Sequence, residues 1–313
     1  MNQEQPPRRD FLRYVGTMAA LSTPALHAAA REENRVSFAP IFDKSEKPEK
    51  TEPPRDSWDK RVGVAVVGLG RIAIDEMLPA YRSQYEALDR ALVSMIRDKK
   101  LGTLKECNPV NSRNMGDPQH WRLKKAMAGG GALPDIGIYC INAARFLSGE
   151  EPSEVFGSVW STPGDARFRE VEESCQFVLR FPSGFSATCS TNYCAHKSQM
   201  FRLNGFDAWA EMDSGYAYHG NKLRITRVVD GKDQASDIPA DKKNQFTLMI
   251  DHFASRIQQN KDVHTPGEEG LQDQRIMEAI YESARSGRVV KLTPPAGKTR
   301  GPQPESVDWN PSR

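Results

Sequence analysis

The stretch that decides the fold is GVAVVGLGRIAIDEMLPAYRSQYEALDR, residues 63–90. It opens with a short apolar run, Val64–Val67, passes through a glycine-rich turn and enters a segment, 72–80, that reads as the start of a helix. A strand, a tight turn and a helix in this order are typical of the first unit of a parallel α/β sheet. Residues 81–98 keep helical spacing instead of forming a second strand, so the sheet does not continue in the usual way.

The turn fits the G-x-G-x-x-G/A pattern of dinucleotide-binding folds, in which backbone amides at a helix N-terminus face a pyrophosphate. Its candidate cofactor-binding residues are Gly68, Leu69, Gly70, Arg71, Ile72 and Ala73. A second strand carrying a ribose-binding group is expected about 20 residues later. The segment ALVSMIRD at 91–98 is predicted to be helical instead, with Asp98 as a solvated charge, so the Rossmann-like unit is truncated.

Bulk composition excludes several classes of function. The 313-residue chain has 43 Lys plus Arg against 41 Asp plus Glu, and the basic residues are scattered, so no nucleic-acid surface is expected. Five cysteines are an odd number without C-x-x-C pairs or histidines at zinc-site spacing. They are predicted to be buried thiols and no metal site is expected; a bridge between Cys189 and Cys194 within a hairpin stays open as an alternative.

The N-terminal stretch PPRRDFLRYVGTMAALSTPALHAAA has the layout of a twin-arginine export signal, with Arg8 and Arg9 followed by a mild apolar run that ends in small residues. The run is too short and too weakly apolar for a stable membrane span. The sequence therefore predicts a signal peptide over 1–30, cleavage near Ala28 or Ala30, export by the twin-arginine machinery and a periplasmic location. The alternative is an ordinary amphipathic N-terminal helix.

The rest of the chain divides into segments that differ in composition and predicted secondary structure. The predicted segments are a polar Pro-rich arm (31–60), a remnant of a dinucleotide-binding domain (61–100), a substrate and oligomerisation sheet domain (101–293) and a flexible tail (294–313). Turn signals separate six predicted strands: VFGSVW, CQFVLRF, FSATCSTNY, MFRLNGF, AWAEM and KLRITRVV. A loop is predicted over 109–118, and helices over 133–149, 244–260 and 272–285. The fold class is α+β: a truncated Rossmann-like βα unit followed by a mostly antiparallel open sheet flanked by helices.

Four stretches together resemble the Gfo/Idh/MocA family, in its glucose–fructose oxidoreductase-like branch. They are GVAVVGLGRIA, AYRSQYEALDRALVSMIRDKKLG, WRLKKAMAGGGALPDIGIYCINAARFLSGEEPSEV and TPGEEGLQDQRIMEAIYESARSGRVVKL, and the resemblance covers about residues 61–292. It implies an oxidoreductase that uses NADP or NAD to move a hydride between nicotinamide and a sugar or polyol. It also implies periplasmic export and a homo-oligomer formed through the sheet.

The resemblance also assigns roles to single residues. It implies that Asp135 and Tyr139 are the acidic and the proton-transferring residue facing the substrate, and that Arg82, Trp121 and Arg122 lie near the cofactor. The alternatives are structural: a tyrosine packed at the rim of the sheet, an aspartate that caps its helix, and ordinary packing for the other three. GEEG at 267–270 is predicted to form a turn and cap before the last helix, with no chemistry.

Much of the family's nucleotide domain has no counterpart here. In the family, several more βα units, the last with a Glu-Lys-Pro lysine beside the nicotinamide, separate the counterparts of Ala80 and Tyr81. The two are adjacent here, which we interpret as an internal deletion of roughly a hundred residues. The Glu-Lys-Pro at 46–48 precedes the first strand and cannot substitute. Three hypotheses follow: a shortened oxidoreductase, a non-catalytic oligomerising or sugar-binding remnant, or an enzyme sequence that has lost an internal segment. We expect the purified chain to retain no stoichiometric NADP.

Overall fold

The computed structural model describes residues 88–217, 220–239 and 245–302. The predicted signal peptide, arm and glycine turn, with Gly68–Ala73 and Arg82, lie outside the described residues. The helical elements are α4 (Leu88–Arg97), η3 (Trp121–Leu123), α5 (Lys125–Ala128), η4 (Leu133–Gly137), α6 (Ile138–Ser148), η5 (Ala166–Phe168), α7 (Gln245–Gln259) and α8 (Gly267–Ser286). The strands are β1 (Leu104–Asn114), β2 (Glu154–Trp160), β3 (Ser174–Arg180), β4 (Ser186–Asn192), β5 (Cys194–Gly205), β6 (Ala208–Asp213), β7 (Lys222–Val229), β8 (Lys232–Ile238) and β9 (Val290–Lys291).

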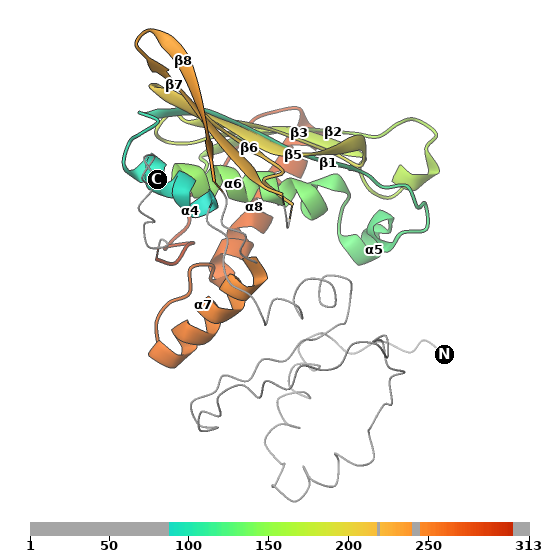
Figure 1. Cartoon of the computed structure of the whole chain (residues 1–313). Helices are drawn as coiled ribbons and strands as arrows, with labels where there is room; N and C mark the ends of the chain where they lie inside the picture. The colour runs from blue at the N-terminus through green and yellow to red at the C-terminus, as the bar shows by residue number, and fades with distance from the viewer. Residues whose placement is uncertain (1–87, 218–219, 240–244, 303–313) are drawn as a thin grey trace, which may run out of the picture. The chain divides into compact units, whose positions relative to one another are not determined.

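The strands form one nine-stranded sheet in the order β8-β7-β6-β5-β1-β4-β3-β2-β9. Every neighbouring pair is antiparallel except β1 and β4, which run parallel. Figure 1 shows α4, α6 and α8 on one side of this sheet. No described helix covers the opposite face, so the predicted mostly antiparallel open sheet flanked by helices is confirmed for this part of the chain.

Alternating burial along the strands explains why the sheet has one covered and one open face. In β4, Ala187, Cys189 and Thr191 are buried while the residues between them are partly or fully exposed, and β6 alternates in the same way. Period-2 alternation of this kind places every second side chain on the helix-covered face. There the strands pack against α6 and α8 through residues such as Ile141 and Ile280.

The centre of the sheet corrects the prediction of a loop over 109–118. Residues 104–114 form β1, which pairs with β4 on one side and β5 on the other. The sequence NPVNSRN has the Pro and Asn residues that usually mark a loop. Pro109 is tolerated because it faces Phe201 in the ladder with β5, while the register with β4 is interrupted at residues 108 and 109. Tertiary pairing therefore overrides the local turn preference.

The helices largely follow the sequence, with one correction at the last of them. The predicted helix over 133–149 is confirmed as η4 and α6, which end at Gly149 in the left-handed conformation. Residues 91–97 are helical in α4, as predicted. GEEG at 267–270 is not a separate turn: it is the first turn of α8, where Glu268 and Glu269 meet the positive end of the helix dipole.

All five cysteines are free thiols, and four of them are buried: Cys107, Cys140, Cys175 and Cys189. Burial raises the pKa of the Cys140 thiol to about 12, and it raises the pKa of the other three in the same direction. The alternative of a Cys189–Cys194 bridge is therefore wrong. Within the described ranges, no group of three His, Cys, Asp or Glu side chains is arranged to hold a metal ion. None of the helices there has the length and apolar character that a membrane span needs.

A buried ionic network joins α6, α8 and the C-terminal segment. Arg145 is fully buried, and its guanidinium donates to both oxygens of Glu151 at 2.9 and 2.7 Å and to Asp273 at 2.5 Å. Arg300 lies 3.2 Å from Glu269. The network therefore contains three carboxylates and two guanidinium groups, an excess of one negative charge.

The same network contacts residues 299–301 of the segment that was predicted to be a flexible tail. The Thr299 hydroxyl donates to Glu151, Arg300 donates to the Asn142 carbonyl, and the Gly301 amide donates to the His264 carbonyl at 3.1 Å. The segment 299–301 is thus fixed onto α6 and the α7–α8 connection. The Pro and Gly content of this segment indicated fraying. No local pattern in the sequence indicates that Arg300 lies against Glu269 of α8.

The burial of Asp273 in this network predicts a pH dependence of stability. Burial raises the pKa of Asp273 above its ordinary value of 3.8, although Arg145 and Asn142 act in the opposite direction. A carboxyl with a raised pKa in the folded state adds stability that is fully present below pH 3.8 and is lost as the pH rises through the folded-state value. We expect the free energy of unfolding of the wild type, minus that of Asp273→Asn, to fall as the pH rises above 3.8.

Urea unfolding at several pH values measures this difference. Glu278→Gln, an exposed change on the same helix, is the matched control. A difference between wild type and Asp273→Asn that grows with pH would contradict the raised pKa of Asp273.

Candidate functional site

The helical segment η4–α6 carries both residues that the sequence assigned to the substrate side. Asp135 lies in η4, and Tyr139 lies in the first turn of α6, one helical turn later. The segment can lie close to β4 because Gly137 has no side chain: a Cβ there would lie 3.2 Å from the Thr191 methyl carbon and 3.0 Å from Leu133. The sequence G-I-Y therefore places Tyr139 just beyond a close helix–sheet contact.

The triple glycine before η4 fixes where this helical segment starts. A Cβ on Gly131 would lie 2.0 Å from the Glu172 carbonyl oxygen, which leaves room for glycine alone. The Glu172 carboxylate accepts hydrogen bonds at 2.9 Å from the amides of Gly131 and Leu133 and from the Tyr281 hydroxyl. These bonds satisfy amides at the start of the segment, which would otherwise lack partners. They hold Asp135 and Tyr139 in a fixed place on the sheet.

The Asp135 carboxylate is held by three donors. Arg122 Nε donates to Oδ1 at 2.7 Å, while Arg113 and the Tyr193 hydroxyl, the latter at 2.8 Å, donate to Oδ2. Two guanidinium groups face one carboxylate, so this cluster carries a net positive charge. Because charge-assisted bonds to both oxygens are strong and directional, they fix the orientation of the carboxylate.

Tyr193 is the buried member of this cluster. Its side chain is fully buried, and burial together with Asp135 raises the pKa of Tyr193 above its ordinary value. The Arg113 guanidinium lies over its ring, 5.6 Å from the ring centre. The phenol is therefore a permanent hydrogen-bond donor to Asp135 and not a group that exchanges protons with solvent.

Beside the cluster, Trp121 and Arg122 form a flat surface that solvent can reach. The Trp121 side chain is 46% exposed, and the Arg122 guanidinium lies 4.3 Å from the centre of its ring. His120 stacks on the same indole at 5.9 Å, and its Nδ1 accepts from the Arg122 amide. We call these three residues the Trp121 surface. An exposed aromatic ring beside fixed polar groups is a common feature of ligand sites.

Tyr139 differs from Tyr193 in its exposure. It is 42% exposed, and its ring lies 5.9 Å from that of Tyr216 at an interplanar angle of 52°. Its position on α6 leaves part of the side chain at the surface, where a ligand can contact it. The structure thus describes four of the predicted site residues: Asp135, Tyr139, Trp121 and Arg122. Arg122 joins two of the others, because it bonds to Asp135 and its guanidinium lies over the Trp121 ring.

The sequence missed Arg113 and Tyr193. Arg113 was assigned to a loop that is in fact β1, and Tyr193 follows β4, the parallel neighbour of β1. Only the register of these two strands brings both side chains to Asp135. A local pattern could have indicated a tyrosine and an arginine at strand ends, but not their convergence on one carboxylate.

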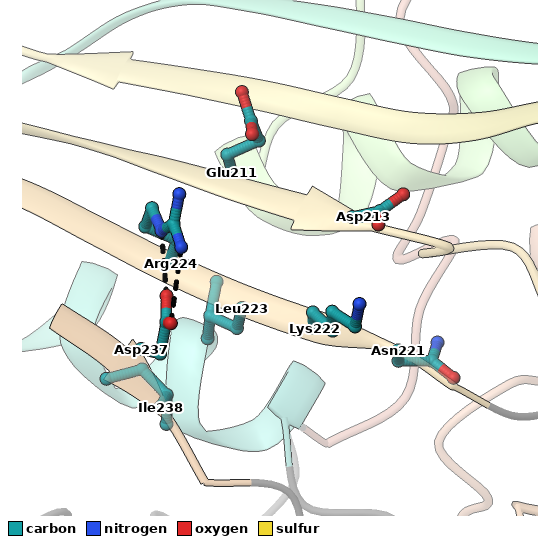
Figure 2. Close-up of a pocket in the computed structure, with 8 residues that line it drawn as sticks. All are labelled: Glu211, Asp213, Asn221, Lys222, Leu223, Arg224, Asp237 and Ile238. Carbon is teal, nitrogen blue, oxygen red and sulfur yellow. Dashed lines mark hydrogen bonds and ion pairs between the residues drawn. The ribbon is translucent and has the colours of Figure 1, made fainter. Parts of the chain in front are cut away.

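A hollow of about 430 Å³ lies elsewhere, on β6, β7 and β8. Figure 2 shows its lining, in which Arg224 pairs with Asp237 at 2.7 and 3.2 Å. That pair is exposed to solvent, so it adds little to stability. The hollow shares no residue with the Asp135 cluster, and three acidic and two basic side chains line it, so it carries no excess of positive charge.

Comparisons with known proteins show which chains this one is similar to. The sequence profile of the GFO/IDH/MocA C-terminal domain matches residues 90–211. Among curated proteins, the chain is 28% identical over 178 residues to a D-xylose 1-dehydrogenase [NADP(+)] of Haloarcula marismortui, covering 56% of this chain and 48% of that protein. The chain therefore spans about half the length of the curated relatives it matches.

Solved structures give the same picture. The aldose-aldose oxidoreductase from Caulobacter crescentus, complexed with glycerol, is 39% identical with a TM-score of 0.61, covering 64% of this chain and 59% of that one. A levoglucosan dehydrogenase in complex with NADH has a TM-score of 0.56 at 20% identity, covering 65% of this chain and 62% of that one, a likeness of fold alone.

Proposed function

Residues 90–211 form a GFO/IDH/MocA C-terminal domain, and from this we propose that the described part of the chain is the sugar-binding side of an NAD(P)-dependent sugar oxidoreductase. The substrate class is a sugar or polyol. The names of the relatives given above describe enzymes that act on sugars, and they include NADP and NADH. The cofactor that we propose is therefore NADP or NAD.

One observation carries this proposal: the Asp135 cluster fixes charged donors beside the exposed Trp121 surface. Hydroxyl groups of a sugar can bond to the free edges of guanidinium groups, and its C–H face can lie on an indole ring. The cluster costs little reorganisation on binding because its members already bond to one another. Tyr139, exposed on the following turn, is the residue we assign to the proton of the reacting hydroxyl.

The described residues that could face a nicotinamide nucleotide fit such a group. The Trp121 ring with the Arg122 guanidinium stacked on it is flat, exposed and cationic, which suits either an aromatic ring or a phosphate. Gly68–Ala73 would hold the pyrophosphate. When bound, the cofactor supplies the hydride acceptor or donor.

The chain's own residues then do the remaining work. Tyr139 takes the hydroxyl proton during oxidation and returns it during reduction. Arg122 and Arg113, fixed by Asp135, orient the sugar so that the reacting carbon is presented in one pose. The hydrogen bond from the Tyr193 hydroxyl helps to keep Asp135 in place.

We also propose that the chain is exported by the twin-arginine route to the periplasm and forms a homo-oligomer through the open face of its sheet. The support for the oligomer is that this face exposes large apolar side chains on β2, with Phe156 43% and Trp160 54% exposed. The support for export is the paired Arg8-Arg9 and the apolar run that follows.

A second candidate function is a sugar-binding or oligomerising module without hydride transfer. The observation that favours it is the direct junction of Ala80 with Tyr81, where the family has further βα units and a lysine beside the nicotinamide. On this reading the Asp135 cluster still binds a sugar, but no turnover accompanies binding.

Tryptophan fluorescence of the purified full chain tests the proposal. We expect D-xylose or D-glucose to change the emission, and the change to disappear in Trp121→Leu while it persists in Trp160→Leu, which removes an indole of similar exposure from the open face. A change that depends on Trp160 instead of Trp121 would contradict the assigned site. In parallel, NADPH titration separates the two candidate functions: stoichiometric binding supports the oxidoreductase, and its absence supports the binding module and the interpretation of a deleted nucleotide domain.

A further inference from the structure

Helix α7 buries none of its side chains between residues 249 and 259. The contrast with α8 is large, since α8 packs Ile276, Met277 and Ile280 fully into the core. An isolated helix of 15 residues is only marginally stable in water, so helices of this length normally depend on tertiary packing. Within the described residues, His252 of α7 stacks on His264 at 3.8 Å, but the large apolar side chains of the helix remain about half exposed.

The exposed side chains of α7 are not randomly placed. Met249, Phe253 and Ile257 are spaced by four residues, which places them in one row along the helix. Each is about half exposed, at 51%, 52% and 52%. We call this row the α7 stripe. Three large apolar side chains in one row indicate a surface that another segment covers.

A segment of the same chain has the matching character. Residues 62–80, VGVAVVGLGRIAIDEMLPA, hold the apolar run of Val64–Val67 followed by Ile72, Ile74, Met77 and Leu78. Only seven residues separate Ala80 from Leu88, where α4 begins. A fully extended linker of this length spans about 25 Å, so the segment must end near the start of α4. Figure 1 shows α4 and α7 on the same side of the sheet.

We propose that the α7 stripe is the docking face for residues 62–80 of the same chain. The interface is intramolecular: the apolar side chains of the segment cover Met249, Phe253 and Ile257, and the short linker keeps the two surfaces at high effective concentration. Helix α7 is thereby an attachment point for the glycine turn at 68–73, and the stripe does not touch the Asp135 cluster.

Hydrogen exchange of the full-length chain, read by mass spectrometry on peptides from 62–80, tests this. Phe253→Ala keeps a residue that favours helix and removes the ring, and Phe253→Asp adds a charge to the stripe. We expect protection of the 62–80 amides in the wild type, and a loss of about tenfold in Phe253→Ala and more in Phe253→Asp. Amides of β3 and β4 should be unchanged. Gln258→Asp places the same charge on the opposite side of α7 and is the control.

Three results would overturn the proposal. The first is exchange of 62–80 at the unprotected rate in the wild type. The second is an equal loss of protection in Gln258→Asp and Phe253→Asp. The third is a wild type that sediments as a dimer and dissociates in Phe253→Ala, which would assign the stripe to a second copy of the chain.

Discussion

Replacing Arg145 with Met should lower the free energy of unfolding by about 3–5 kcal/mol. The Arg145 guanidinium is fully buried and donates to Glu151 and Asp273 together. Burial alone would lower the pKa of Arg145, but the two carboxylates raise it, so the guanidinium stays charged. Met matches the volume of the side chain but leaves both carboxylates without their cation.

The neighbouring Arg300 cannot take over. Burial and the charge of Arg145 lower the pKa of Arg300 to about 10, and two of its buried nitrogen atoms have no hydrogen-bond partner among the described residues. It already lies against Glu269 at 3.2 Å, so moving it toward Asp273 would leave Glu269 without its cation. The loss in Arg145→Met is therefore not compensated from within the network.

Urea or thermal unfolding measures this effect, and Arg224→Met supplies a matched control. Arg224 also makes two bonds to one carboxylate, that of Asp237, but the pair is exposed to solvent (Figure 2). Its removal should leave the unfolding midpoint almost unchanged. If Arg145→Met were as stable as Arg224→Met, water or protonation would have to stabilise the Glu151 and Asp273 carboxylates in place of Arg145. The network would then not be what holds residues 299–301.

The network also shows where sequence reasoning stops. Alternation of apolar residues was sufficient to predict β2, β3, β4, β6 and β7, because each strand has one buried and one open face and the side-chain period is fixed at two. The same rule failed for β1, in which Pro109, Asn111 and Ser112 are buried and the strand pairs with a neighbour on each side. In that strand the neighbours decide the conformation, and a local pattern contains no information about them.

The candidate site divides in the same way. Asp135, Tyr139, Trp121 and Arg122 could be named from the sequence because they lie in one continuous stretch that resembles a family motif. Arg113 could not, because its contact with Asp135 spans 22 residues and depends on the parallel register of β1 and β4. Long-range convergence of charged groups on one carboxylate follows from topology, which local spacing does not encode.

Replacing Tyr139 with Phe should lower kcat for NADP-dependent sugar oxidation by about 10²–10⁴-fold, since that is the range supplied by a positioned general acid–base group. The substitution removes one hydroxyl from a side chain that is 42% exposed, so folding should be unaffected. KM for the sugar should change little, because the Asp135 cluster and the Trp121 surface remain. Tyr281→Phe is the comparison variant for a positioning role, since it deletes a hydroxyl that supports the η4–α6 segment through Glu172 without facing a substrate.

Steady-state kinetics with NADP and a panel of aldoses, read by absorbance of the reduced cofactor, separates the alternatives. A fall in kcat confined to Tyr139→Phe supports proton transfer by this phenol, because a structural role would change both tyrosine variants alike. Equal kcat in wild type and Tyr139→Phe would remove Tyr139 from the chemistry. A wild type that binds sugar at Trp121 without any turnover would instead favour the binding module, since an oriented sugar and a proton acceptor cannot move a hydride unless the nucleotide side of the site is held in place as well.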